Sequence, residues 1–308
     1  MPKNSPLVSI VIPVYNGADF VEEAIESALT QTYRSIEVIV IDDGSNDEGK
    51  TREILERYKN DVSLFIKPNG GCASALNLGI SQMNGSYFSW LSHDDIYDPS
   101  KIERQLQLLD VYGEDSIVYS NIRIINTVGD ILSETKHDRT FKRDALEDPF
   151  IPLALSLING CSLLITKKLI SSGFEEKYIT TQDYHKWREI LPKTKIIFCP
   201  EALVYSRSHS NQDSLTNPRH TKEADEYWEI FFGQVIQSKY SSNLLSKDEM
   251  VLLAKWHLKN SGYAYTKKAI EFSLHQIYET RKEKALTYGD WEPNQIDSVV
   301  KKISLLDK

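Results

Sequence analysis

Short apolar segments alternate with amphipathic segments along the first 115 residues of the chain. Four of the apolar segments have the length and composition of strands, namely residues 7–13, 36–41, 62–67 and 87–91. The segments between them carry apolar positions at helical spacing, over residues 19–29, 49–58 and 73–83. This order predicts right-handed βαβ units and an α/β fold with a mixed, mostly parallel sheet flanked by helices.

Polar side chains mark the starts of two helices. Asp19 is followed by Glu22 at the spacing of a capping box, and Asp98 precedes Pro99, a residue type that suits the first helical position. We therefore expect Asp19 and Asp98 to cap the helices that follow them.

The pattern changes after residue 116. Residues 117–125 and the turn at Gly129 predict a strand and a hairpin, and residues 162–166 and 196–198 predict further strands. This part of the chain is therefore expected to be mixed α/β.

The last part of the chain, residues 221–308, is expected to be helical, because apolar residues recur at helical spacing from Tyr227 onward. The chain is thus predicted to form an α/β domain over residues 1–220 and a helical C-terminal extension. The α/β domain has two halves, at about 1–115 and 116–220.

Composition narrows the class of protein. Of 308 residues, 41% are hydrophobic and 26% are charged, which excludes collagen-like, low-complexity and wholly disordered chains. The net charge of −8 and the lack of a long Lys/Arg run exclude sequence-independent binding to nucleic acid. A phosphate-bearing ligand must then be held locally, by a helix end, a few cations or a metal ion.

Three observations bear on where the protein acts. Residues 1–6 lead into the first strand without the apolar stretch of a signal peptide, so we expect no export. The most apolar later window, residues 150–165, is interrupted by Pro152 and Gly160, which favours core elements over a membrane span. The three cysteines are scattered and none has CxxC spacing, which indicates buried thiols in a reducing cytoplasm.

Polar loops follow the predicted parallel strands, at the edge where such sheets bind ligands. Asp94 and Asp95 repel each other, and a hard cation such as Mg²⁺ or Mn²⁺ would relieve this; an ordinary acidic turn is the alternative. Asp42 and Asp43 would accept hydrogen bonds from a base or a ribose, or would form an Asx turn. Tyr15 would stack on a base or pack under its loop.

Taken together, these residues resemble the opening signature of the family 2 glycosyltransferases, the inverting enzymes of the GT-A fold. Residues 8–16, 28–33 and 36–45 match that signature almost position by position. The resemblance becomes looser toward His209 and ends at about residue 220. It implies a Rossmann-like GT-A catalytic domain, with the nucleotide-sugar in the first half and the acceptor in the second.

The resemblance implies roles for individual residues. Asp95 would bind a divalent metal, Mn²⁺ or Mg²⁺, that bridges the diphosphate of the donor. His209 would be a further metal ligand and Arg207 a diphosphate contact, and an exposed loop is the alternative for both. The nucleotide would be bound by Pro13, Tyr15, Asn16, Asp43, Asn69, Gly70 and Asp94.

The catalytic base that the resemblance implies is Asp183, although Gln182 replaces the acidic neighbour that is usual there. A helix N-cap is the alternative, and one residue can serve both roles. His93 stands where many relatives have the first Asp of the metal motif, and we expect it outside the metal shell. Leu76 stands where many relatives carry Arg, so that cationic contact is absent.

The implied activity is that of a metal-dependent, inverting hexosyl- or N-acetylhexosaminyltransferase. It would move a sugar from a UDP-sugar to a hydroxyl of a glycan or lipid-linked saccharide in surface polysaccharide biosynthesis. One alternative is a metal-dependent nucleotidyltransferase, although the loop 15–19 lacks the basic residues typical of that class. The other is a non-catalytic nucleotide-sugar-binding protein.

Partners and location follow from the same resemblance. We expect a cytoplasmic protein that binds a nucleotide-sugar and a saccharide acceptor, and no nucleic acid. Residues 221–308 leave three interpretations open: a contact with the acceptor, a homodimer or partner face, and peripheral contact with the inner face of a membrane.

Overall fold

The chain divides into two units, Met1–Asn217 and Pro218–Lys308, in a computed structural model of its 308 residues. Most of the predicted helical extension lies outside the described residues. Tyr227 and Phe231 are helical, and their rings stack at a centroid distance of 5.6 Å. The structure describes residues 5–140, 142–149, 151–154, 156–210, 212, 217–220, 222–224, 226–227 and 230–231.

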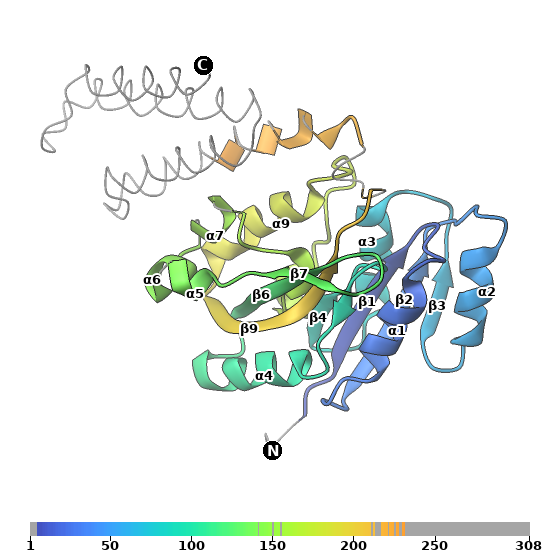
Figure 1. The fold of residues 1–308 in the computed structure, drawn as a ribbon. Helices are drawn as coiled ribbons and strands as arrows, with labels where there is room; N and C mark the ends of the chain where they lie inside the picture. Colours follow the sequence, from blue (N-terminus) through green and yellow to red (C-terminus); the bar gives the residue numbers. More distant parts are fainter. Residues whose placement is uncertain are drawn as a thin grey trace, which may run out of the picture. The chain divides into compact units, whose positions relative to one another are not determined.

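Five strands of the first unit form one sheet (Figure 1), namely β1 (Val8–Val14), β2 (Ile36–Asp42), β3 (Ser63–Ile66), β4 (Tyr87–Trp90) and β8 (Ile165–Thr166). Their order is β3-β2-β1-β4-β8, in which β1 to β4 are parallel and β8 is antiparallel to β4. All residues of β1 and β4 are buried, because a sheet covered on both faces requires continuous apolar runs. The four predicted parallel strands are confirmed.

Four longer helices accompany these strands, namely α1 (Val21–Leu29), α2 (Lys50–Arg57), α3 (Cys72–Gln82) and α4 (Lys101–Tyr112). Figure 1 shows α1 and α3 on opposite faces of the sheet, as right-handed crossovers require when the strand order reverses after β3. An added Cβ on Gly79 would lie 2.3 Å from Cγ1 of Val11, so this glycine lets α3 approach β1 closely.

The two predicted helix caps are wrong. Phe20 is the N-cap of α1, no side chain caps it, and Glu22 and Glu23 instead place negative charge in the first turn. Asp98 lies one turn before α4, and its Oδ1 accepts hydrogen bonds from the backbone N–H and the hydroxyl of Ser100. Asp98 therefore shapes the turn before the helix, and helix formation begins after it.

A second sheet contains β5 (Ile96–Tyr97), β6 (Ile117–Ile125), β7 (Ile131–Glu134) and β9 (Ile196–Arg207) in the order β5-β9-β6-β7. The predicted hairpin forms between β6 and β7, and Gly129 turns the chain with a φ of 91°. The predicted strand at 196–198 is the start of β9. The prediction for 162–166 is only partly right, because residues Gly160–Ser162 form the 3₁₀ turn η1, which Asn159 caps.

Further elements, most of them shorter, complete the first unit. They are α5 (His137–Thr140), α6 (Arg143–Leu146), α7 (Ile151–Ala154), α8 (Lys167–Ile170), α9 (Gln182–Ile190) and the 3₁₀ turn η2 (Leu191–Lys193). An aromatic cluster connects α9 to the end of β4, because the Phe174 ring lies 5.7 Å from that of Trp187 and 6.3 Å from that of Trp90. The described residues contain no helix with the length and apolar character needed to cross a membrane.

Candidate functional site

The carboxyl ends of β1, β2, β3 and β4 meet at one edge of the first sheet, because the four strands are parallel and adjacent. Backbone hydrogen bonds continue just beyond the strands, from Asp43 N–H to Val14 O at 2.8 Å and from Lys67 N–H to Asp42 O at 3.0 Å. Pro13 is tolerated in β1 because the ladder with β4 ends at Val11, so no neighbour needs the missing N–H. The predicted convergence of the polar loops is confirmed.

Asn16 joins the loops that follow β1 and β2. It has a left-handed backbone with a φ of 50°, which Asn tolerates better than most residues. Its Oδ1 accepts from the backbone N–H of Asn46 at 2.8 Å, and its Nδ2 donates to Asn46 Oδ1 at 2.9 Å. The Tyr15 hydroxyl also donates to Asn46 Oδ1, while 40% of Tyr15 remains exposed. This leaves the Tyr15 ring available as a stacking surface at the edge.

The two carboxylates at the end of β2 have different roles. Asp42 Oδ1 accepts the backbone N–H of Ser45, three residues on, at 2.9 Å, so it closes a turn one residue longer than an Asx turn. Asp43 is 3% exposed and accepts from the backbone N–H groups of Gly70 and Gly71 and from the Lys67 ammonium. Asp43 therefore connects β2 to the loop after β3.

Asp94 and Asp95 lie in the turn between β4 and β5. Asp95 is 5% exposed, and burial together with the negative charge of Asp94 raises its pKa to about 7. Its Oδ1 accepts the backbone N–H of Arg207 at 2.9 Å. His209 Nε2 lies 3.0 Å from Asp94 Oδ2, and its ring packs beside Phe20. The structure thus brings both carboxylates and His209 together.

Arg207 is buried in β9, so the exposed-loop alternative for it is wrong, while its predicted diphosphate contact stays a prediction. Only 1% of it is exposed, and its guanidinium donates to backbone oxygens of Asp94, Asn126 and Thr127 and to the Glu23 carboxylate. A diphosphate could reach this guanidinium only if some of these hydrogen bonds broke. The geometry therefore favours a structural role for Arg207 over a contact with the donor.

The side chains at this turn can be compared with the ligand types that divalent cations prefer. Asp94 and Asp95 offer hard oxygen ligands and His209 a ring nitrogen, which are ligand types that Mn²⁺ and Mg²⁺ accept. Within the described residues, no Lys or Arg side chain forms an ion pair with Asp95, so its charge has no counter-ion there. The described residues also contain no group of three His, Cys, Asp or Glu placed to hold a metal. Asp94, Asp95 and His209 are thus candidate ligands by type, and a cation here would need further ligands from a substrate or water.

Asp183 lies in the first turn of α9, directly after Gln182, while Thr181 is the N-cap. Its carboxylate accepts from its own backbone N–H and that of Tyr184, but burial dominates and raises its pKa to about 6. A carboxylate with this pKa is a better proton acceptor near neutral pH than an ordinary Asp. The alternative that Asp183 is the helix N-cap is wrong, because the N-cap is Thr181, two positions earlier.

Sequence reasoning missed two residues of the site. The Cys161 thiol interacts with Asp95 and lies 3.3 Å from the Ser92 hydroxyl, so η1 supports the acidic turn. Lys67 Nζ lies 2.5 Å from Asp43 Oδ1. Lys67 stands at the end of the predicted third strand and could have been noticed in the sequence. Cys161 is a lone cysteine far along the chain, and no sequence pattern pointed to it. His93 packs against Gly17, where an added Cβ would lie 2.5 Å from its ring.

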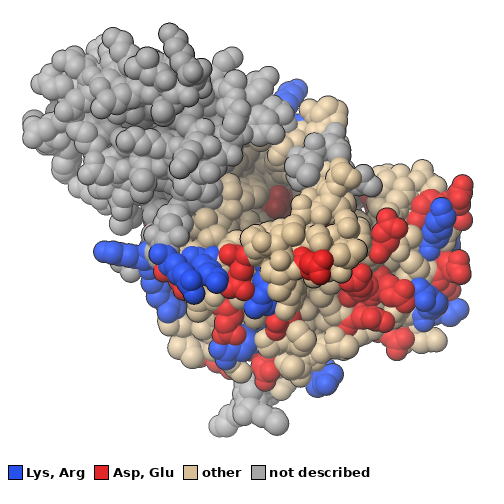
Figure 2. Space-filling model, viewed as in Figure 1, with Lys and Arg blue, Asp and Glu red and all other residues tan. Residues whose placement is uncertain are grey.

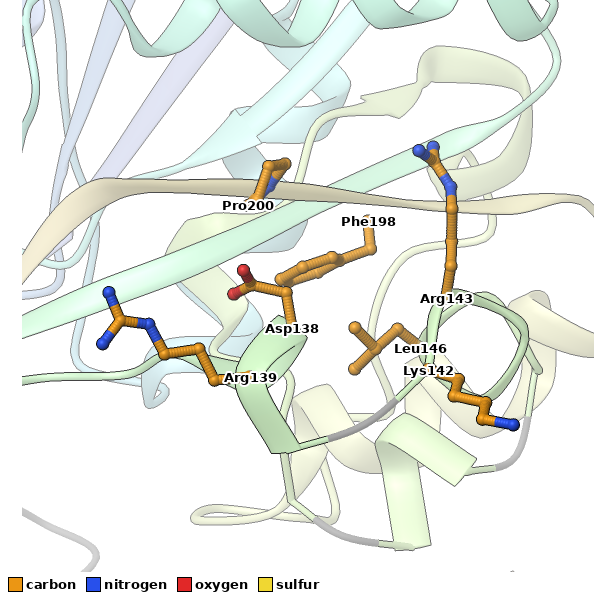
Figure 3. A pocket seen from close by; sticks show the side chains of 7 residues that line it. All are labelled: Asp138, Arg139, Lys142, Arg143, Leu146, Phe198 and Pro200. Atoms are coloured by element: carbon orange, nitrogen blue, oxygen red, sulfur yellow. The ribbon is translucent and has the colours of Figure 1, made fainter.

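A separate cavity of about 500 Å³ lies between α5, α6 and the start of β9 (Figure 3). Phe198, on its lining, is roughly 30 Å along β9 from Arg207, at 3.3 Å per residue. Figure 3 shows the side chains of Arg139, Lys142 and Arg143 extending in different directions, so these cations do not converge on one point. The cavity is distinct from the edge that carries Asp95.

The two sheets and the acidic turn at the carboxyl edge have the arrangement of a GT-A type fold. The sequence model of glycosyl transferase family 2 matches residues 9–172. An uncharacterized glycosyltransferase of Rickettsia typhi is 42% identical over 252 residues, which cover 81% of this chain and 76% of that protein. The chain belongs to glycosyl transferase family 2.

Other curated relatives are longer than this chain. An uncharacterized glycosyltransferase of Rickettsia felis is 44% identical over 76% of the chain, but the match covers 39% of that protein. Chondroitin synthase of Pasteurella multocida is 27% identical over 97% of the chain and is covered over 30% of its length. The chain thus spans about two fifths or less of the length of several relatives that it matches.

Solved structures share the fold. The crystal structure of S. aureus TarS 1-349 in complex with UDP-GlcNAc has a TM-score of 0.67 and 16% sequence identity, over 95% of this chain and 83% of that one. A mannosyltransferase from Pyrobaculum calidifontis in complex with GDP-Man and Mn²⁺ has a TM-score of 0.57 and 16% identity, over 99% of this chain and 81% of that one. The predicted GT-A fold is confirmed.

Proposed function

We propose that the chain is an inverting glycosyltransferase that moves a sugar from a UDP-sugar to a hydroxyl group of a saccharide acceptor. The observation that carries this proposal is the Asp94–Asp95 turn with its buried Asp95 at the carboxyl edge of the sheet, next to the loops of Tyr15 and Asp43. An acidic pair at this place suits a metal-bound diphosphate, and membership of family 2 supports the reaction class.

Donor binding is assigned to the loops that converge at this edge. Tyr15 offers a stacking surface for the base, Asn16 and Pro13 shape its pocket, and Asp43 with Asn69 and Gly70 contacts its edge. Asp94 lies near the ribose. UDP is the preferred nucleotide, in line with the UDP-GlcNAc of the TarS structure.

Asp95 would hold a divalent cation, Mn²⁺ or Mg²⁺, and His209 lies close enough to Asp94 to take part. When bound, such a cation neutralises negative charge on the leaving diphosphate. The Mn²⁺ in the mannosyltransferase structure supports this choice of cofactor.

Asp183 is the proposed catalytic base. It accepts the proton of the acceptor hydroxyl as the hydroxyl oxygen attacks the anomeric carbon, and the bond from that carbon to the diphosphate breaks. A single displacement of this kind inverts the anomeric configuration, as in inverting glycoside hydrolysis, where a carboxylate activates the nucleophile.

The proposed acceptor is a glycan or a lipid-linked saccharide used in surface polysaccharide synthesis in the cytoplasm, at the inner face of the membrane. The similarity to chondroitin synthase supports a polysaccharide product. A panel of saccharide acceptors incubated with radiolabelled donor tests this part of the proposal separately from the donor chemistry.

The decisive experiment is a nucleotide-release assay with UDP-sugars, GDP-sugars and Mn²⁺. We expect release of UDP, and Asp183→Asn should lower the rate by about 10²- to 10⁴-fold, the usual contribution of a general base. UDP binding should stay within about twofold, because Asp183 belongs to the acceptor side. Asp115→Asn, at a side chain that is 85% exposed, is the matched control and should leave the rate unchanged.

Two results would contradict the proposal. Near wild-type turnover by Asp183→Asn would remove Asp183 from the mechanism. Release of pyrophosphate in place of UDP would assign the chain to nucleotidyl transfer.

A further inference from the structure

The Asp43 carboxylate is surrounded by hydrogen-bond donors from one loop. Its Oδ1 accepts from Lys67 Nζ at 2.5 Å and from Gly70 N–H at 3.0 Å. Its Oδ2 accepts from Gly70 N–H at 3.2 Å and from Gly71 N–H at 2.7 Å. A carboxylate has about four acceptor positions, and three N–H donors share them because the Gly70 N–H is divided between both oxygens, so about one position is left for a ligand.

Lys67 is the member of this cluster that a ligand meets first. The side chain of Lys67 is 18% exposed, whereas that of Asp43 is 4% exposed. Besides Asp43, the ammonium donates to the backbone oxygen of Pro68 at 2.8 Å. An ammonium group has three N–H donors, so one donor is left for a ligand.

Gly70 makes room for this arrangement. An added Cβ at Gly70 would lie 2.8 Å from Lys67 Nζ and 2.8 Å from the Ser74 hydroxyl. A side chain at this position would therefore displace the Lys67 ammonium from Asp43.

The N–H donors around Asp43 suit uracil better than guanine. The pairing edge of uracil has two carbonyl acceptors and one N–H, whereas that of guanine has one acceptor and two adjacent donors. The two adjacent donors of guanine pair best with a carboxylate that has an open acceptor position on each oxygen. Asp43 does not offer two open positions. Uracil needs one carboxylate oxygen for its N–H, and its carbonyl oxygens need donors such as the Lys67 ammonium.

We propose that Lys67 is a specificity-determining residue that selects uracil over guanine, by occupying Asp43 Oδ1 and by donating to a carbonyl oxygen of the base. This inference rests on the proposed function, because it assigns the base of the nucleotide donor to this edge. It assigns to Lys67 a role that is separate from general attraction of phosphate, since that attraction would act equally on UDP and GDP.

The test compares the dissociation constants of UDP and GDP, measured by titration calorimetry with Mn²⁺, for wild type and Lys67→Met. The wild-type protein should prefer UDP by tenfold or more. Lys67→Met should reduce the ratio of GDP to UDP dissociation constants by about tenfold, the effect of one lost charge-assisted hydrogen bond. Lys67→Arg keeps donors and charge and should retain the preference.

Two further variants keep the result interpretable. Lys59→Met removes an exposed cation that also pairs with a carboxylate, and it should leave the ratio unchanged. Gly70→Ala should displace the ammonium without removing it, and it should lower the ratio in the same direction if Lys67→Met fails to fold.

The outcomes separate the two proposals. If Lys67→Met weakens UDP and GDP equally, or changes neither, the assignment of specificity to Lys67 is overturned while nucleotide binding stands. If the wild-type protein binds neither nucleotide, the proposed donor class itself fails.

Discussion

Carboxylates of the same residue type differ in role because their immediate surroundings differ. Asp42 closes a local turn with Ser45, and Asp43 is held by N–H donors of another loop. Asp95 is buried beside the charge of Asp94, and desolvation dominates at Asp183. Each role follows from which partner lies within hydrogen-bond reach and from how much water is excluded.

The raised pKa of Asp183 predicts the pH dependence of turnover. A general base must be ionised, and its protonated fraction grows as the pH falls below its pKa of about 6. With saturating donor and Mn²⁺, log kcat should therefore be flat above pH 7 and should fall with a slope of one below pH 6. Initial rates between pH 4.5 and 8 test this, and a rate that stays constant down to pH 4.5 would show that no such base acts.

The elements of the two sheets are held together at the end of β9. Arg207 lies at this end, and its guanidinium connects the turn of the β6–β7 hairpin to Glu23 of α1 and to the Asp94 backbone. The same residue donates its backbone N–H to Asp95. One buried side chain thus fixes a helix, a hairpin and the acidic turn relative to one another.

Arg207→Met should destabilise the protein, because it leaves several buried oxygens without a donor. The expected loss is about 2–4 kcal/mol of unfolding free energy, which corresponds to a fall of roughly 5–15 °C in Tm for a domain of this size. Thermal unfolding measured by circular dichroism tests this. Arg104→Met is the matched control, since its ion pair with Glu201 is exposed and is worth at most about 1 kcal/mol. Equal Tm values for the two variants would contradict a structural role for Arg207.

On the scale of the whole molecule, the net charge of −8 works against binding an anionic donor. Figure 2 shows acidic side chains over the surface of α1 and basic ones over α5 and α6, so on this face the two kinds of charge lie on different parts of the solvated surface. The proposed donor binding would therefore depend on local cations at the carboxyl edge, and the Asp94–Asp95 turn is the place proposed for one.

Metal removal tests this dependence directly. UDP with Mn²⁺ should raise Tm by several degrees, because a ligand that binds only the folded state stabilises it. EDTA should abolish the shift, and Asp95→Ala should do the same with Mn²⁺ present, while Asp115→Ala should behave like wild type. An equal shift with UDP in EDTA would show that the diphosphate is bound without a cation.

Much of the fold follows from local patterns. The four parallel strands and the helices between them were predictable because burial on two faces imposes apolar runs, and burial on one face imposes helical spacing. The two helix caps were not. A local turn gives the Asp98 side chain Ser100 as its partner, and α1 begins at Val21, two positions after Asp19.

The sequence by itself predicted that the loops after four parallel strands converge, which brought Tyr15, Asp43 and Asp95 to one edge, because parallel strands end at the same edge of a sheet. Asp183 came only from the resemblance to family 2. Only the tertiary structure decided which N–H groups donate to the Asp43 carboxylate and whether Arg207 is buried. Arg207 donates to Asp95 across 112 positions of the chain, and such contacts depend on how distant elements pack. Local periodicity contains no information on that packing, so partners within one site emerge only when the whole domain is assembled.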